Sequence, residues 1–283
     1  MNGELDDDVF DPAWLDLREP IDLRSRNEEL ARALARHLGH RPSIAVVDLG
    51  AGTGSNLRAT APLLGPEQHW TLVDHDEAVL EAALSRLCGW ASSVERNGGR
   101  LLLSKHGKRI SVRFTLADLA QDLENVLDVR PDLVTASALF DLTSDELIAT
   151  LAAKVVRLDA AFFTVLTYNG VQRWTPRHDA DSAMASAFHA HQGLDKGFGP
   201  AAGPFAPALL AAAFDEAGYT VSEGDSTWRL EAGDERLINT LASGFAAAVQ
   251  ETGRVSESDL ANWLAVKRRG ALVGHTDTLA LPG

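Results

Sequence analysis

The stretch Val46–Asn56, VVDLGAGTGSN, decides the fold. It begins in a short apolar run, passes through Gly50, Gly52 and Gly54, and leads into a helix expected over Leu57–Leu64. Glycines have no Cβ, so the backbone of such a turn can approach a ligand closely at a helix N-terminus. The pattern predicts a strand, a turn that binds a nucleotide-like ligand, and a helix, as in open α/β sheets.

Two acidic residues flank this turn. Asp48 precedes the glycines and is expected to direct its carboxylate at the ligand, and Asp74 ends the next apolar run, 20 residues beyond Gly54. An acid at that spacing binds both ribose hydroxyls and disfavours a 2′-phosphate. The spacing Gly-x-Gly-x-Gly also differs from the Gly-x-Gly-x-x-Gly of dinucleotide folds, which disfavours a nicotinamide oxidoreductase.

Strands and helices alternate along the rest of the chain, and this alternation predicts the α/β class with a doubly wound, mostly parallel sheet. The last strand is expected to be antiparallel and to close the edge of the sheet. The expected strands are Ile44–Leu49, Trp70–Val73, Leu101–Ser104, Ile110–Leu116, Asp132–Ser137, Ala160–Thr167, Ser226–Ala232 and Gly274–Pro282. The expected helices are Glu77–Trp90, Asp145–Leu158, Pro207–Tyr219, Asp234–Gln250 and Ser256–Arg268.

An N-terminal helical cap is expected over residues 1–40, before the main domain of residues 41–283. Leu23, Leu30, Leu34 and Leu38 recur at helical spacing within one helical segment, and Gly39 is a C-terminal stop signal. Arg24 in this cap is a candidate substrate-binding residue. The alternative is a solvated arginine on an exposed helix face.

Four motifs and the last strand, in the same order, resemble those of the class I S-adenosylmethionine-dependent methyltransferases, over most of the chain from about Arg41 onward. The first strand and its glycine turn match the first motif, and the acid after the second strand matches the ribose-binding acid. Asp118 with Leu119 matches the third motif, Thr135–Ser144 the fourth-strand motif, and Gly274–Pro282 the antiparallel seventh strand.

The resemblance implies a seven-stranded sheet whose last strand inserts between strands five and six, and S-adenosylmethionine as the cofactor. The role of Asn56 stays open, and Asp118 and Asp141 are equally plausible as N-caps of the helices that follow them. The cofactor-binding residues that the resemblance implies are Asp48, Gly50, Gly52, Gly54, Asn56, Asp74, His75, Asp118, Leu119, Ser137 and Ala138. Acids at strand ends suit the ammonium and hydroxyl groups of this cofactor better than a pyrophosphate.

A lid that forms the acceptor site is expected over residues 168–207, because it follows the fifth strand and contains a glycine-rich stretch over Gly193–Pro207. Its candidate catalytic residues are Tyr168, His189 and His191, with an imidazole as proton acceptor. Asn169 and Trp174 are candidate substrate-binding residues. The alternative is that the histidines are surface residues of a lid helix. No metal site is expected, because no carboxylate or cysteine completes a ligand spacing.

The amino-acid composition limits the classes of partner that the protein is expected to bind. The 283 residues hold 26 Lys and Arg against 40 Asp and Glu, a net charge of −14, so the protein repels nucleic-acid backbones and anionic membranes. One cysteine fits a reducing compartment. Residues 1–10 lack the features of a signal peptide, and no apolar run is long enough to span a membrane, so we expect a cytoplasmic protein.

The sequence therefore predicts an enzyme that transfers a methyl group from S-adenosylmethionine to oxygen or nitrogen of a small molecule. Two alternatives remain: a protein that binds this cofactor without catalysis, and a methyltransferase that acts on a protein or peptide. The sequence does not set the oligomeric state.

Overall fold

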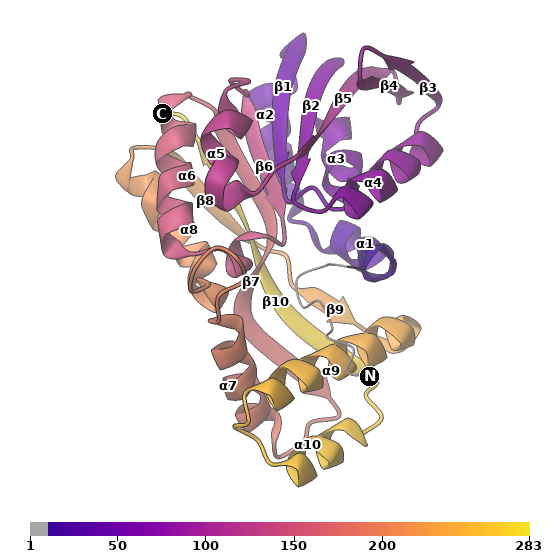
Figure 1. The fold of residues 1–283 in the computed structure, drawn as a ribbon, viewed down its shortest axis with the longest axis vertical. Coiled ribbons are helices and arrows are strands. Elements are labelled where there is room, and N and C mark those ends of the chain that lie inside the picture. The colour runs from indigo at the N-terminus through magenta and orange to yellow at the C-terminus, as the bar shows by residue number, and fades with distance from the viewer. Residues whose placement is uncertain (1–10) are drawn as a thin grey trace.

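The computed structural model describes residues 11–283. Residues 1–10 lie outside the described residues. Two expectations fall on them: the lack of signal-peptide features and the start of the N-terminal helical cap. Over the described part, a twisted central sheet runs through the molecule with helices packed against it (Figure 1). The α/β class expected from the alternation of elements is confirmed.

One sheet contains all the strands of the described residues, in the order β3-β4-β5-β2-β1-β6-β7-β10-β8, with β9 paired to β10. Neighbours from β5 to β7 are parallel, and β10 is antiparallel to both β7 and β8. The strands are β1 Ser43–Leu49, β2 Glu67–Asp74, β3 Ser93–Asn97, β4 Arg100–Lys105, β5 Lys108–Leu116, β6 Leu133–Ser137, β7 Ala161–Thr175, β8 Thr220–Asp225, β9 Trp228–Leu230 and β10 Gly270–Leu281.

The strand order confirms the insertion that the resemblance implied, because β10 lies between β7 and β8. The expectation that the last strand closes the edge of the sheet is wrong. The sheet of the described residues also has three strands more than the seven that the resemblance implied: β3 and β4 extend it past β5, and β9 pairs with β10. Of these, β4 and β9 were expected from their own sequence patterns. Neither β3 nor β8 was expected, since every residue of β3 is exposed and β8 has no buried residue, so neither shows an apolar alternation.

Helices cover both faces of the sheet, which makes the fold doubly wound. Leu34 on α2 and Leu57 on α3 belong to one buried cluster, whereas Leu123 on α5 and Leu151 on α6 belong to the other. The helices are α1 Pro12–Ser25, α2 Glu28–Leu38, α3 Ser55–Thr60, α4 Glu77–Trp90, α5 Leu119–Leu127, α6 Asp145–Arg157, α7 Asp181–Gln192, α8 Ala206–Glu216, α9 Glu235–Glu251 and α10 Glu257–Leu264, with 3₁₀ turns at Ala61–Leu63, Phe140–Leu142, Gly203–Phe205 and Ala232–Asp234.

The N-terminal region forms two helices rather than the one helical segment expected. Asn27 separates α1 from α2, because its side chain accepts hydrogen bonds from the backbone N–H groups of Glu29 and Leu30, both at 3.1 Å. This is an N-cap, which requires non-helical backbone at Asn27 itself. In Figure 1, α1 lies at the junction between the main sheet and the lower part of the molecule.

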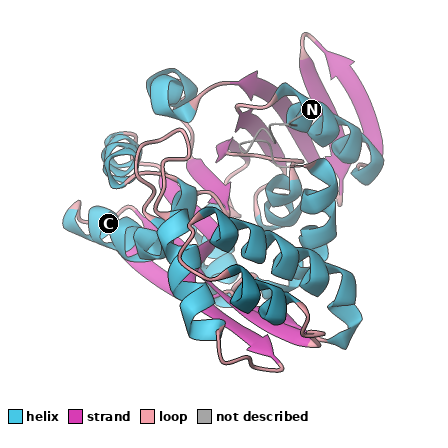
Figure 2. Ribbon diagram, turned by 60° about the horizontal axis from the view of Figure 1, so that its bottom comes forward, coloured by secondary structure: helices cyan, strands magenta, loops and turns pink. Residues whose placement is uncertain are grey.

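The prediction of a lid over residues 168–207 is wrong for residues 168–175, which belong to β7. The strand expected to end at Thr167 continues to Thr175, because β10 pairs with it in an antiparallel register that includes Tyr168 opposite His275 and Trp174 opposite Ala271. The two long strands run downward toward α7, α9 and α10 (Figure 1), where α7 contacts β7, α9 contacts β10 and α10 contacts α9. Figure 2 shows helices lying in front of the long strands. Of the loop expected over Gly193–Pro207, residues 193–202 are irregular, whereas the 3₁₀ turn Gly203–Phe205 and the start of α8 form the rest.

No helix within residues 11–283 combines the length and the apolar character that crossing a membrane requires.

Candidate functional site

The glycine turn after β1 has a backbone that favours glycine. Gly52 has a φ of +53°, and a Cβ added there would meet only the Leu15 side chain, at 3.4 Å. Apart from Leu15, the space next to Gly52 is therefore open, and a backbone without a Cβ there can be approached closely. Gly54 differs, because a Cβ at this residue would contact Leu87 and Ala83 of α4 at 3.5 and 3.7 Å. Gly54 allows the turn to pack against α4.

Asp74, at the end of β2, is fixed across this turn. One of its carboxylate oxygens accepts a hydrogen bond from the Gly52 backbone N–H at 2.9 Å, and the other accepts one from the Asp76 N–H at 3.2 Å. Each oxygen keeps a lone pair for a further donor. The carboxylate is thus held in place beside the turn with capacity to accept hydrogen bonds from a ligand.

A cavity of about 520 Å³ opens at the carboxyl ends of β1, β2, β5 and β6. Such a position is where open α/β sheets bind their ligands. Nine of the eleven residues that the resemblance assigned to the cofactor line it: Gly50, Gly52, Asn56, Asp74, His75, Asp118, Leu119, Ser137 and Ala138. Asp48 and Gly54 do not.

Asp48 lies behind the turn and is fully buried, contrary to the expectation that its carboxylate faces the ligand. Its Oδ1 accepts a hydrogen bond from Asn56 Nδ2 at 2.6 Å, and Asn56 Oδ1 accepts one from the partly buried Arg26 guanidinium. Burial raises the pKa of Asp48 to about 7, although the Asn56 hydrogen bond acts in the opposite direction. Asn56, whose role the sequence left open, links Asp48 to Arg26 at the wall of the cavity.

Asp118 is compatible with both roles that the sequence left open, and its cofactor-binding role stays a prediction. It is the N-cap of α5, accepting a hydrogen bond from the Ala120 N–H at 2.9 Å, and it also lines the cavity. Asp141 is buried in the 3₁₀ turn after β6 and is not among the cavity residues. Burial raises the pKa of Asp141 to about 6.

Helix α1 supplies cavity residues that the sequence reasoning missed: Leu15, Arg18 and Asp22. Arg18 Nε donates to Asp22 Oδ2 at 2.8 Å, so the pair lies side by side on one face of the helix. The i, i+4 spacing of the two charges was the only sequence signal for it. Burial raises the pKa of Asp22, against the lowering effect of Arg18.

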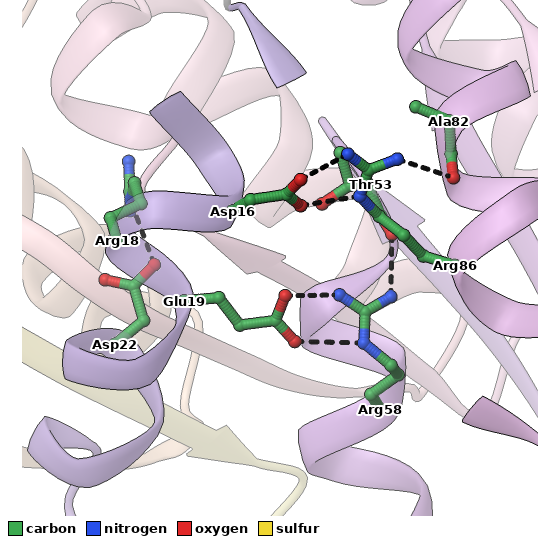
Figure 3. Close-up of polar contacts among 8 residues, drawn as sticks. All are labelled: Asp16, Arg18, Glu19, Asp22, Thr53, Arg58, Ala82 and Arg86. Carbon is green, nitrogen blue, oxygen red and sulfur yellow. Dashed lines mark hydrogen bonds and ion pairs between the residues drawn. The ribbon is translucent and has the colours of Figure 1, made fainter. Parts of the chain in front are cut away.

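Two ion pairs fasten α1 to the elements around the cavity (Figure 3). Glu19 accepts two hydrogen bonds from Arg58 on α3, and Asp16 accepts two from Arg86 on α4. Such paired bonds fix both partners in orientation. Helix α1 is therefore a wall of the cavity, held in position from two sides.

Among the candidate catalytic residues, only His191 lines the cavity. Its Nε2 is 2.7 Å from Glu251 Oε2 on α9. Tyr168 and His189 form a hydrogen bond with each other instead, with 3.1 Å between Tyr168 Oη and His189 Nε2. Burial raises the pKa of Tyr168, so its hydroxyl stays protonated at neutral pH.

The three candidate substrate-binding residues lie elsewhere. Asn169 on β7 donates to Thr276 Oγ1 on β10 at 3.2 Å, and Trp174 packs edge-on against Trp263 in the lower core. Both residues lie in the last part of β7, which belongs to the sheet because it pairs with β10. Arg24 forms two 2.7 Å hydrogen bonds with Asp234, so its charge is already paired.

The part of the chain that the structure describes has no group of three or more His, Cys, Asp or Glu side chains arranged to hold a metal ion.

Comparisons with known proteins bear on the fold. No family model matches the sequence, and no curated protein matches it. Among solved structures, one from Bacillus halodurans, provisionally described as a methyltransferase, aligns over 91% of this chain and 100% of its own, with 16% identity and a TM-score of 0.50. The YcgJ protein of Bacillus subtilis aligns over 91% of this chain and 100% of its own, with 12% identity and a TM-score of 0.49. With the strand order given above, the comparison shows that this chain has the fold of the class I S-adenosylmethionine-dependent methyltransferases.

Proposed function

We propose that this protein is an S-adenosylmethionine-dependent methyltransferase that methylates oxygen or nitrogen of a small molecule. The observation that carries the proposal is the cavity at the carboxyl ends of the parallel strands, with the glycine turn and the fixed Asp74 carboxylate in its wall. A fold by itself does not set function, so the argument rests on this site.

The residues fit the cofactor group by group. Asp74 keeps lone pairs for the two ribose hydroxyls, Asp118 can accept from the adenine amino group, and Leu119 packs beside the ring. The open space at Gly52 lets the cofactor lie against the backbone. Asp74, Asp76 and Asp118 give this end of the cavity three carboxylates, which favours a ligand with a net positive charge.

Arg18 is the candidate partner for the carboxylate of the cofactor's methionine part. Within the described residues, Asp22 is the one carboxylate within 4 Å of its guanidinium, and that contact uses Nε. The two terminal nitrogens remain for a second carboxylate, the group that guanidinium binds best. The assignment also gives a reason for the arginine to lie in the cavity wall.

S-adenosylmethionine supplies an electrophilic methyl group bonded to a sulfonium. The task of the chain is then to hold the acceptor in line with that methyl group and to exclude water, which can account for most of the rate of such a displacement. Residues of helix α1 and of the end of α7 line the cavity, and they would hold the acceptor and exclude water.

His191 is the candidate proton acceptor. If Nε2 carries the proton and donates to Glu251, Nδ1 is free to take a proton from the acceptor's hydroxyl or amine. The Glu251 carboxylate would fix this tautomer and stabilise the imidazolium that forms. Replacing Glu251 by Gln is expected to lower turnover and leave cofactor affinity unchanged.

The test is incubation of the protein with a small-molecule cell extract and S-adenosylmethionine that carries a trideuterated methyl group. A product with a labelled methyl, formed together with S-adenosylhomocysteine, is expected by mass spectrometry and should be absent with the Gly52→Val variant. Cofactor binding without turnover in any fraction would favour a non-catalytic binding protein. Label in the protein and peptide fraction would favour a macromolecular acceptor.

A further inference from the structure

The cavity has two ends of different character. The end over β2 and β5 has the carboxylates Asp74, Asp76 and Asp118 in its wall. The other end lies beyond β6, where α7 and the loop at residues 193–202 complete the wall. If the cofactor takes the first end, the second is left for the acceptor.

Apolar side chains dominate the second end. Phe188 on α7 packs against Phe245 with ring centres 4.6 Å apart and the ring planes tilted by 41°, so its position in the wall is fixed by this contact. Phe198 of the loop and Leu142 of the turn after β6 face the same space. This end fits a ring or a short alkyl chain.

The charged side chains at this end are one carboxylate, Asp22, and two cations, Arg18 and Lys196. Asp22 is the one carboxylate in this part of the wall, and Arg18 pairs with it. Lys196 lines the cavity, and no carboxylate of the described residues lies within 4 Å of its ammonium group. An unpaired cation beside an apolar pocket favours an anionic ligand.

The loop that carries Lys196 has a defined shape. The Asp195 carboxylate accepts hydrogen bonds from the backbone N–H groups of Gly197 and Gly199, at 2.8 and 2.9 Å. A β-bridge joins Asp195 to Pro200 across the loop. The Asp195 carboxylate, next to Lys196 in the sequence, thus forms hydrogen bonds within the loop. Lys196 lines the cavity from a loop of defined shape.

We propose that the methyl acceptor is a small carboxylate with an apolar body, whose carboxylate is bound by Lys196 and whose body lies between Phe188 and Phe198. The proposal rests on the methyltransferase function argued above. One ammonium group without a carboxylate partner among residues 11–283 matches the single charge of a carboxylate better than the double charge of a phosphate monoester. A cationic acceptor is disfavoured at this end, because it would meet Lys196 with like charge.

The test measures binding to the full chain saturated with S-adenosylhomocysteine. Two sets of probes differ only in charge: 4-hydroxyphenylacetate, its amide and tyramine, and octanoate, octanamide and octylamine. In at least one set we expect the carboxylate to bind about tenfold or more tightly than the amide and the amine, the size of a hydrogen bond to a charged group. Lys196→Gln should remove this preference.

Lys267→Gln is the matched control, because Lys267 is exposed, pairs with Glu235 and lies outside the cavity wall. It should keep the preference for the carboxylate, and both variants should bind S-adenosylhomocysteine as the parent does. Equal or tighter binding of an amide or amine, a preference that survives Lys196→Gln, or no binding of either carboxylate would overturn the proposal. If S-adenosylhomocysteine itself fails to bind, the proposed methyltransferase function is what fails.

Discussion

Arg58 on α3 binds Glu19 on α1 through two hydrogen bonds, from Nε at 2.9 Å and from Nη2 at 2.6 Å (Figure 3). Its third nitrogen donates to the backbone oxygen of Thr53, within the glycine turn, at 2.8 Å. One guanidinium therefore joins the N-terminal helix to the turn. The position of α1 and the shape of the turn are coupled, although the two are far apart in the sequence.

Glu19→Gln should loosen α1 and weaken cofactor binding. The amide cannot accept both hydrogen bonds, and a lost hydrogen bond to a charged group costs about 1.5–3 kcal/mol. Amide hydrogen exchange should become faster in α1, and calorimetry should show weaker binding of S-adenosylhomocysteine. Glu28→Gln is the control, since Glu28 pairs with Arg32 in an exposed position where such pairs contribute little. Equal exchange rates in α1 for both variants would argue against the coupling.

Gly52→Val should abolish S-adenosylhomocysteine binding, because the branched side chain would fill the open space beside the turn. Valine at a positive φ also strains the backbone, by roughly 1–2 kcal/mol. Gly98→Val separates the two effects: Gly98 has a φ of +55° with no atom within 4 Å of an added Cβ. The control should lose stability only. Undiminished binding to a folded Gly52→Val variant would place the ligand elsewhere.

Asp74→Asn should weaken S-adenosylhomocysteine binding by about 1.5–3 kcal/mol, the usual contribution of hydrogen bonds to a charged group. The asparagine oxygen can still accept from the Gly52 N–H, so the turn should keep its shape and the melting temperature should change little. Titration calorimetry of the folded variant measures the loss. An affinity equal to that of the parent would show that the ribose does not lie at Asp74.

Asp48→Asn should change how stability depends on pH. Burial raises the pKa of Asp48 to about 7 from its ordinary 3.8, so between these values the unfolded chain loses the proton while the folded one keeps it. The free energy of unfolding therefore falls as the pH rises across that window, and is constant above it. The variant should show a shallower fall in urea titrations from pH 5 to 8. Asp145→Asn, at an exposed position on α6, should keep the parent's slope, and a variant slope equal to the parent's would count against a buried, protonated Asp48.

The local parts of the site were predictable from the sequence. The glycine turn and Asp74 form a short continuous pattern, and parallel strands place their carboxyl ends at the same edge of the sheet. Asn27 could also have been predicted as an N-cap, because Glu28 and Glu29 follow it. These features could be predicted because each depends only on residues a few positions away in the sequence.

Long-range pairing accounts for what the sequence did not predict. Tyr168 and Trp174 belong to a strand only because β10, about a hundred residues later, pairs with them. The bonds from α1 to Arg58 and Arg86 join residues 39 and 70 positions apart, with no periodic pattern to mark them. Charged side chains that pair across the fold look the same in the sequence as solvated ones.

The most direct test of the account is a crystal structure of the protein with S-adenosylhomocysteine. We expect the ribose hydroxyls within hydrogen-bonding distance of the Asp74 carboxylate, the adenine beside Leu119, and the methionine carboxylate at Arg18. The sulfur should face the end of the cavity where Lys196 lies. Ligand bound away from the glycine turn, or no ligand in crystals soaked at saturating concentration, would contradict the account.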